Sequence, residues 1–268
     1  MSAHSTALDF YQQLFDVSGK VALITGGTRG IGLMIAEGLV KAGANVYVVS
    51  RKPDACEETA ALLSKHGRCK AIPADVSSIA GCQQLAEEMG GREQQLNILV
   101  NNAGVTWSED IDLFHEKAWD KVMDLDVKSP FFLLQQLLPM IRRGATAEAR
   151  ASVINVTSIN AFRPSILRNY SYVAAKAGLG QLSVQLARDL LDDNINVNVI
   201  APGLFKSKMT APLFADEKAA QKLLEGQPMK RSGTMEDIAG LVIYLSSRAG
   251  QYITGGTVIC DGGQITTT

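Results

Sequence analysis

VALITGGTRGIG, residues 21–32, joins a buried strand to a helix through a turn rich in glycine. Val21–Thr25 is a continuous run of the kind expected for a strand covered on both faces of a parallel sheet. Apolar residues at helical spacing follow the glycines. Glycines suit a sharp turn, and they let a pyrophosphate approach the N–H groups at a helix N-terminus. Plain tight turns also use glycine, so the position between strand and helix is what predicts the first βα unit of a dinucleotide fold.

The composition excludes several classes of function. The chain has 268 residues, 46% of them hydrophobic, and a net charge of −1, which gives no basic field for nucleic acid or for an anionic membrane surface. No run of about 18 apolar residues predicts a membrane span. The first 20 residues lack the pattern of a secretory signal. We therefore expect a cytoplasmic protein.

Cysteine and histidine give no sign of a metal site. The four cysteines form no C-x-x-C pair, and with three histidines no metal-ligand spacing emerges. We expect isolated, reduced cysteines and no bound metal.

Strand and helix patterns alternate along the chain without a break in composition. We predict strands over residues 21–25, 45–50, 68–74, 96–100, 152–156, 196–200 and 257–260. We predict helices in between, among them 116–143, 171–191 and 235–247. This order predicts an α/β fold, a single Rossmann-like doubly wound parallel sheet of about seven strands with helices on both faces. Residues 1–18 form an N-terminal arm, 19–268 a single catalytic domain, and about 204–228 a substrate loop.

Several motifs follow one another in a familiar order. They are TGGTRGIG at 25–32, Asp75, NNAG at 101–104, Ser158, Y-x-x-x-K at 172–176 and PG at 202–203. Over about residues 17–263 the chain resembles the short-chain dehydrogenase/reductase family. Within it, the segments FDVSGKVALITGG, INVNVIAPG and CDGG resemble the β-ketoacyl-ACP reductase branch, which includes the reductase of rhamnolipid synthesis.

The resemblance implies a catalytic set of Ser158, Tyr172 and Lys176. Tyr172 would be the general acid, and Lys176, one helical turn later on the same face, would lower its pKa and hold the nicotinamide ribose. Ser158 would polarise the substrate carbonyl, with Thr157 as its competitor for that role. Elsewhere, a tyrosine and a lysine four residues apart are simply a surface pair on a helix.

Asp126 departs from the family, which usually has asparagine at this catalytic position. The family uses the main-chain carbonyl of that residue, so a backbone role would survive. A carboxylate could also pair with Lys176 and hinder the proton relay. We expect slower but not absent turnover, and an Asp126→Asn variant with unchanged rate and pH profile would contradict this. The alternative is that Asp126 only caps or solvates a helical turn.

Charge at the end of the second predicted strand indicates the cofactor. An acidic residue there would select NAD, but the strand ends in Ser50 and Arg51, and Arg29 lies in the glycine turn. Two guanidiniums favour a 2′-phosphate and therefore NADP(H), unless both are ordinary solvated arginines. The catalytic Tyr172 and Lys176 are also predicted to bind the cofactor. The remaining predicted cofactor-binding residues are Gly26, Thr28, Gly30, Ile31, Gly32, Asp75, Val76, Asn102, Ala103, Gly104, Pro202, Gly203, Phe205 and Ser207. For Asn102 the resemblance also implies a structural role, stabilising the central strands.

The predicted substrate wall is mainly apolar and suits an acyl chain or an aryl ketone. We predict that Trp107, Asn160, Phe162, Phe205 and Met209 contact substrate, and Thr106, Leu167, Leu213 and Phe214 come from the same loops. For any single one of these apolar side chains, a place in the core is the commoner role. An acyl carrier protein is a further candidate partner, for which Arg142, Arg143 and Arg188 are the basic residues considered.

These residues together predict an NADPH-dependent carbonyl reductase. Its substrate would be a small-molecule ketone, first of all a 3-oxoacyl thioester or related β-keto ester. One alternative is an oxidative dehydrogenase of secondary alcohols or steroids, and another is a non-catalytic NADP-binding regulatory protein. The resemblance also implies a homotetramer.

Overall fold

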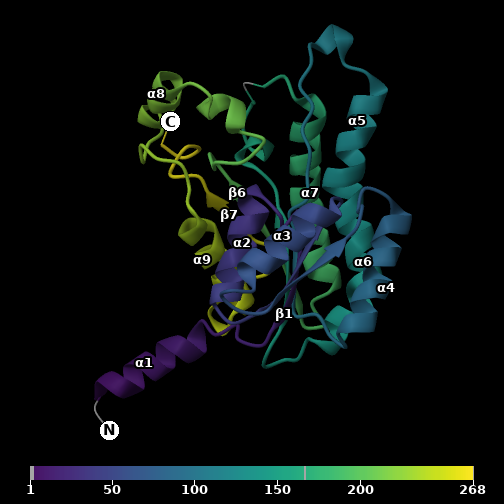
Figure 1. Ribbon diagram of the computed structural model, residues 1–268, viewed down its shortest axis with the longest axis vertical. Helices are drawn as coiled ribbons and strands as arrows, with labels where there is room; N and C mark the ends of the chain where they lie inside the picture. Colours follow the sequence, from purple (N-terminus) through teal and green to yellow (C-terminus); the bar gives the residue numbers. More distant parts are fainter. Residues whose placement is uncertain (1–2, 166, 268) are drawn as a thin grey trace.

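Seven parallel strands form one sheet in the computed structural model, which describes residues 3–165 and 167–267 (Figure 1). The strand order is β3-β2-β1-β4-β5-β6-β7. Their bounds are Val21–Thr25 (β1), Asn45–Ser50 (β2), Cys69–Pro73 (β3), Ile98–Asn101 (β4), Ala151–Val156 (β5), Ile195–Pro202 (β6) and Thr257–Cys260 (β7). The order reverses between β1 and β4, which is where doubly wound sheets bind ligands. The predicted fold class is confirmed, with strand ends shifted by one or two residues.

Helices cover both faces of the sheet. They are α2 (Gly30–Lys41), α3 (Pro53–Leu63), α4 (Ile79–Arg92), α5 (Glu116–Met123), α6 (Ser129–Arg143), α7 (Tyr170–Asp189) and α9 (Met235–Ser246). Because successive strand residues point to opposite faces, Leu23 packs in the core with α4, α6 and α7. Its neighbours Ala22 and Ile24 pack in the core with α2, α3 and α9. The fully buried β1 therefore belongs to both cores.

The predicted helix 116–143 is interrupted by a π turn, η2 (Asp124–Lys128), between α5 and α6. Pro130 explains the interruption, because it has no N–H to donate to the carbonyl of Asp126 four residues earlier. The Ser129 N–H instead donates to the carbonyl of Asp124, five residues back. The turn gives Asp126 a position that an uninterrupted α-helix would not.

The predicted substrate loop, 204–228, is more regular than expected. It contains a short 3-10 helix, η4 (Ala211–Phe214), and an α-helix, α8 (Glu217–Glu225), which the sequence analysis did not predict. Asp216 begins α8 by accepting a hydrogen bond from the Ala219 N–H at 2.7 Å. Only part of this segment is loop.

The N-terminal arm contains a helix, α1 (Ala3–Leu14), that projects away from the sheet and its covering helices (Figure 1). Phe10 and Tyr11 are 60% and 61% exposed. Phe15 makes the arm's aromatic contact with the body, its ring centre 6.4 Å from that of Tyr244. Among the described helices, none is long and apolar enough to cross a membrane.

Gly38 lets α2 and α9 pack closely. A Cβ at Gly38 would lie 2.2 Å from the Cβ of Ala239, whereas a Cβ at Gly240, one residue further along α9, would meet nothing within 4 Å. We predict that Gly38→Ala destabilises the protein by about 1–2 kcal/mol, because overpacking outweighs the gain in helix propensity. Gly240→Ala should stabilise it by up to about 1 kcal/mol. Urea unfolding midpoints of both variants test this, and a Gly38→Ala variant as stable as its parent would contradict it.

Candidate active site

The glycine turn is closed so tightly that Gly26 and Gly32 could not carry side chains. A Cβ at Gly32 would lie 2.3 Å from the Gly26 carbonyl oxygen, and Gly26 itself has a φ of +65°. The turn leads into the N-terminus of α2, where Arg29 is the N-cap residue and no side chain caps the helix. The first N–H groups of α2 therefore have the arrangement that suits an anion.

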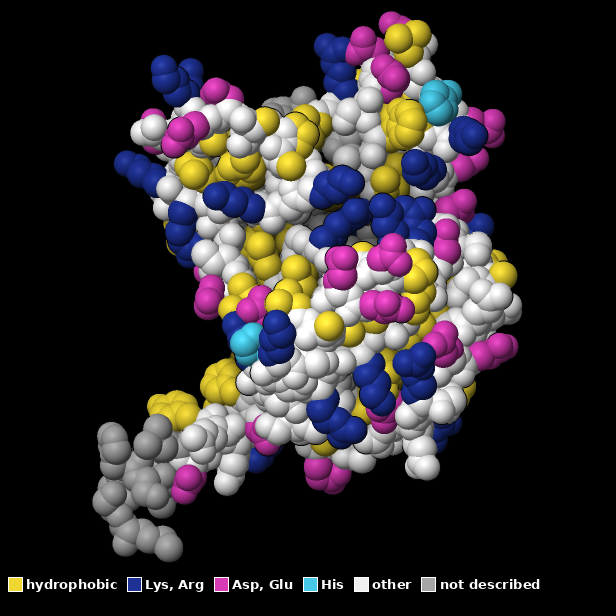
Figure 2. Space-filling view, viewed as in Figure 1, with side chains coloured by type: hydrophobic (Ala, Val, Ile, Leu, Met, Phe, Trp, Pro, Cys, Tyr) yellow, Lys and Arg dark blue, Asp and Glu magenta, His cyan; other side chains and the backbone are white. Residues whose placement is uncertain are grey.

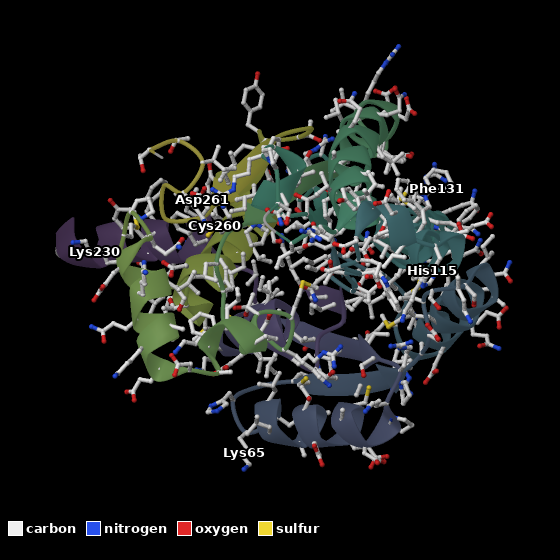
Figure 3. All side chains as sticks on the ribbon, turned by 90° about the horizontal axis from the view of Figure 1, so that it is seen from above. Lys65, His115, Phe131, Lys230, Cys260 and Asp261 are labelled. Carbon is white, nitrogen blue, oxygen red and sulfur yellow. The ribbon has the colours of Figure 1, made fainter. Side chains whose placement is uncertain are left out.

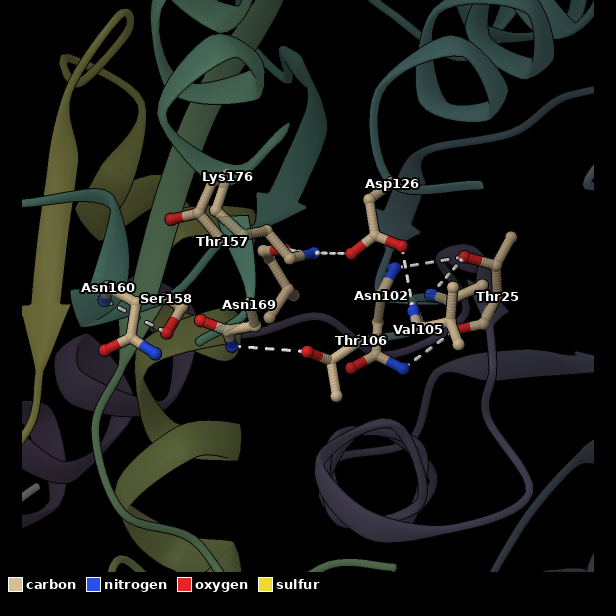
Figure 4. A network of polar contacts seen from close by, with 12 residues as sticks. Thr25, Asn102, Val105, Thr106, Asp126, Thr157, Ser158, Asn160, Asn169 and Lys176 are labelled. Carbon is tan, nitrogen blue, oxygen red and sulfur yellow. Dashed lines mark hydrogen bonds and ion pairs between the residues drawn. The ribbon is translucent and has the colours of Figure 1, made fainter. Parts of the chain in front are cut away.

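Thr25 and Asn102 tie this turn to β4. The Thr25 hydroxyl oxygen accepts hydrogen bonds from the N–H groups of Asn102 and Ala103, both at 3.0 Å. The Asn102 amide donates to the carbonyls of Thr25 at 2.9 Å and Gly26 at 3.3 Å. Asn102 thus has the structural role that the resemblance implied, and it fixes the ends of β1 and β4 together (Figure 4).

Two arginines stand free at this edge. Arg29 and Arg51 are exposed, and neither guanidinium has a hydrogen bond or ion pair with any residue that the structure describes. Figure 2 shows Lys and Arg side chains gathered around the hollow that crosses the middle of this face. Asp75, in contrast, is partly engaged, because its carboxylate accepts the Ser77 N–H at 3.1 Å.

Tyr172 and Lys176 lie one turn apart near the start of α7, as predicted. Both are buried, with 8% and 4% of their surface exposed. The Lys176 Nζ lies 5.5 Å from the centre of the Tyr172 ring and donates to the Val156 carbonyl at 3.1 Å. This contact anchors the lysine to the end of β5.

Asp126 does pair with Lys176. Its Oδ2 lies 3.0 Å from the Lys176 Nζ, and its Oδ1 accepts the Val105 N–H at 2.8 Å (Figure 4). The contact with Lys176 is an ion pair whose angles fall short of a hydrogen bond. Asp126 is fully buried, so the alternative that it only solvates a helical turn is wrong.

The three groups shift one another's pKa. Burial raises the pKa of Tyr172. Lys176 and Ser158 oppose this rise, and Asp126 adds to it. Burial also raises the pKa of Asp126 against the effect of Lys176. Burial disfavours the charge on Lys176, but Asp126 and Tyr172 outweigh it and raise the pKa of the ammonium group. The expectation that Lys176 lowers the pKa of Tyr172 is right for the contact between these two residues. Burial and Asp126 outweigh that contact, so the pKa of Tyr172 is raised overall.

Ser158, and not Thr157, acts on Tyr172. The Thr157 hydroxyl is buried and donates to the Ile200 carbonyl at 3.2 Å. The Ser158 hydroxyl lowers the pKa of Tyr172, and it also accepts the Asn160 N–H at 3.2 Å. Of the two hydroxyls that follow β5, Ser158 is therefore the one beside Tyr172, as the resemblance implied.

Asn169 is a site residue that the sequence analysis missed. It is 2% exposed, and its amide donates to the Thr106 hydroxyl at 3.2 Å, joining the loop after β4 to the start of α7. Arg168 strengthens this junction through an ion pair with Asp110. The one feature of the sequence that could have indicated Asn169 is its position directly before the first turn of α7, where Asn is a common cap.

The predicted substrate residues separate into two groups. Phe162 and Met209 are 52% and 44% exposed, and Trp107 lies under Lys121, whose Nζ is 5.3 Å from its ring. Phe205, in contrast, is 2% exposed and packs in the core against Gly233. Its predicted contact with substrate is therefore corrected, because the ring is not available, while its main chain stays a candidate for the cofactor.

The turn after Phe205 closes over the glycine turn. A Cβ at Gly30 would lie 3.0 Å from the Cβ of Ser207. Thr210 holds the turn by donating to the Phe205 carbonyl at 2.7 Å and accepting the Ser207 N–H at 2.9 Å. Ser207 thus lies beside the glycine turn, the position expected of a residue that faces the cofactor.

A cavity of about 320 Å³ lies on the other side of Phe205, at the end of β7. Cys260 and Asp261 border it, and Figure 3 shows them on the opposite side of the molecule from His115 and Phe131. The Arg231 guanidinium on its wall pairs with Asp237 at 2.5 Å. The charges of that pair are thus already balanced.

The arginines considered for a carrier protein lie far from Tyr172. Arg142 pairs with Asp193 at 2.8 Å, and Arg143 donates to the Gln94 carbonyl at 2.6 Å, both at the end of α6. Arg188 lies at the other end of α7 from Tyr172, about 24 Å along the helix. They therefore give no support to a docking surface beside the site.

Comparisons with known proteins show which family the chain is similar to. The family described as enoyl-(acyl carrier protein) reductase matches residues 26–264. The rhamnolipids biosynthesis 3-oxoacyl-[acyl-carrier-protein] reductase of Pseudomonas aeruginosa is 47% identical over 249 residues, which are 93% of this chain and 97% of that protein. The 2-dehydro-3-deoxy-D-gluconate 5-dehydrogenase of Dickeya dadantii is 37% identical, with 93% and 96% covered.

Solved structures agree as well. The Pseudomonas aeruginosa RhlG/NADP active-site complex superposes with a TM-score of 0.91 at 46% identity, covering 94% of this chain and 98% of that one. L-Sorbose reductase from Gluconobacter frateurii, complexed with NADPH and L-sorbose, has a TM-score of 0.86 at 32% identity, with 95% and 100% covered. The chain therefore belongs to the short-chain dehydrogenase/reductase family.

Proposed function

We propose that this protein is an NADPH-dependent carbonyl reductase that reduces a ketone to an alcohol. The observation that carries the proposal is the meeting of Ser158, Tyr172 and Lys176 at the edge of the sheet where the uncapped N-terminus of α2 lies. Ketone reduction needs an acid that protonates the carbonyl oxygen and a bound donor that gives a hydride to the carbonyl carbon. This edge of the sheet has candidates for the acid and for the residues that would bind the donor.

The residues present fit a dinucleotide. Glycine at positions 26 and 32 lets the turn close, and the free N–H groups of α2 that it leads to suit a pyrophosphate. Arg29 and Arg51 would hold the 2′-phosphate, and Lys176 the nicotinamide ribose. When bound, NADPH supplies the hydride.

The chain's own residues manage the substrate oxygen and its proton. Ser158 would donate a hydrogen bond to the carbonyl oxygen and orient it. Tyr172 would transfer its phenolic proton to that oxygen as the C–O double bond becomes single. The Lys176 ammonium would stabilise the phenolate that remains until solvent returns the proton.

The substrate that we propose is a 3-oxoacyl thioester or a related β-keto ester. The exposed apolar side chains of Phe162 and Met209 support an acyl chain. The name of the 47% identical relative, a 3-oxoacyl-[acyl-carrier-protein] reductase, supports the same class. An acyl carrier protein is accordingly the proposed carrier of the thioester.

We further propose a homotetramer in the cytoplasm. Within the apolar stretch at 131–138 on α6, Leu133, Leu134 and Leu137 pack in the core. Phe131 and Phe132 are only half-buried, and they support association between subunits. The described cysteines are all free, as the reducing cytoplasm would leave them.

Tyr172→Phe tests the proposed reaction. NADPH oxidation with a 3-oxoacyl thioester should fall by about a hundredfold to ten-thousandfold, because the acid is lost, while the protein still binds NADPH. Tyr170→Phe is the matched control, since Tyr170 is 38% exposed and lies on the same helix; it should keep parental turnover. A 2-enoyl thioester, an aryl ketone and a secondary alcohol with NADP⁺ serve as competing substrates. Equal turnover by the Tyr172→Phe variant, or parental turnover with the enoyl thioester alone, would overturn the proposal.

Arg29→Ala and Arg51→Ala test the choice of cofactor. Each should weaken NADPH binding about tenfold to hundredfold, the value of a charge-assisted hydrogen bond, and leave NADH binding unchanged. Fluorescence titration measures both dissociation constants, and Arg188→Ala at the far end of α7 is the control. An equal loss for both cofactors would show that the arginines do not recognise the 2′-phosphate.

A further inference from the structure

We propose that Asp126 sets the pH range of the reaction by balancing the charge of Lys176 beside the Tyr172 phenol. The inference rests on the proposed ketone reduction, in which Tyr172 gives up a proton. Asp126 acts through its neighbours, so it is a positioning residue and not a catalytic one.

The carboxylate is held from two sides. Its Oδ2 lies 3.0 Å from the Lys176 Nζ, and its Oδ1 accepts the Val105 N–H at 2.8 Å. It is fully buried, so water cannot screen its charge. The lysine is equally fixed, because it donates to the Val156 carbonyl at 3.1 Å. The negative charge therefore stays beside the ammonium group.

Few other charges face the phenol. Lys176 comes from its own helix, Asp126 from η2, and the hydroxyl of Ser158 from the end of β5. Val122 of α5 and Ala175 of α7 pack against the ring as apolar neighbours. The remaining charged residues of α5 (Glu116, Lys117, Asp120 and Lys121) are exposed, where solvent weakens their effect.

A paired ammonium stabilises a phenolate less than an unpaired one. Burial also opposes the phenolate, and Asp126 adds to the resulting rise in the pKa of Tyr172. Tyr172 therefore keeps the proton needed for reduction to higher pH. The reverse oxidation needs the phenolate, so a lower pKa of Tyr172 would end reduction at lower pH and begin oxidation at lower pH.

Asp126→Asn removes the charge and keeps an oxygen that can accept the Val105 N–H. The alkaline limb of reduction and the acidic limb of oxidation should both move to lower pH by about one unit. Asp124→Asn is the matched control; Asp124 is in the same π turn, but its side chain is 44% exposed and pairs with Lys128 at 3.1 Å. Its profiles should not move. Unmoved profiles in Asp126→Asn would overturn the inference.

A second measurement requires no turnover. The ultraviolet absorbance of tyrosinate is titrated in the ligand-free protein, and the curve of Tyr172→Phe is subtracted. The difference should show Tyr172 ionising at lower pH in Asp126→Asn than in the parent. Ionisation of Tyr172 at the same pH in both proteins would overturn the inference. The titration uses no substrate, so failure of the proposed reduction leaves this test intact.

Discussion

The hydrogen bonds between Thr25 and Asn102 are the constraint on which the site depends. They fasten the ends of β1 and β4, the two strands between which the sheet reverses its order. The same amide closes the glycine turn by donating to the Gly26 carbonyl. These hydrogen bonds therefore hold the N-terminus of α2 and the loop that carries Val105 in a fixed position relative to each other. The site is built on strand ends whose side chains are fully packed, which gives it the rigidity that catalytic groups need.

The ion pair of Asp126 and Lys176 connects the π turn η2, next to these strand ends, with α7. Burying two charges is costly, and such a pair adds little to stability unless its geometry and hydrogen bonds are good. Here the Val105 N–H donates a hydrogen bond to Asp126, and the Val156 carbonyl accepts one from Lys176. Asp126 lies in the π turn that precedes Pro130, a kind of turn often found at functional sites. The local backbone thus places the charge that acts on the phenol.

The sequence predicted the parts of the molecule where local pattern and packing agree. Apolar runs located the strands, and the glycine turn and the Tyr172–Lys176 spacing located the site. The misses have physical causes. α8 has nine residues and none of them is buried. Its apolar stripe consists of the half-buried Ala220, Leu223 and Leu224, which is too short a pattern to predict a helix with. Phe205 follows a strand end, where exposure depends on whether Gly233, far along the chain, leaves space for the ring. The net shift in the pKa of Tyr172 depends on burial and on Asp126, which only the fold brings close.

The most direct test of this account is to follow the hydrogen that is transferred. A 3-oxoacyl thioester is reduced with NADPH that carries deuterium at the transferable position of the nicotinamide, and the product is analysed by mass spectrometry. The account predicts a 3-hydroxyacyl thioester with one deuterium on the carbon that bears the hydroxyl group. Product without deuterium at that carbon, or tight binding of NADPH with no transfer to any ketone, would contradict it.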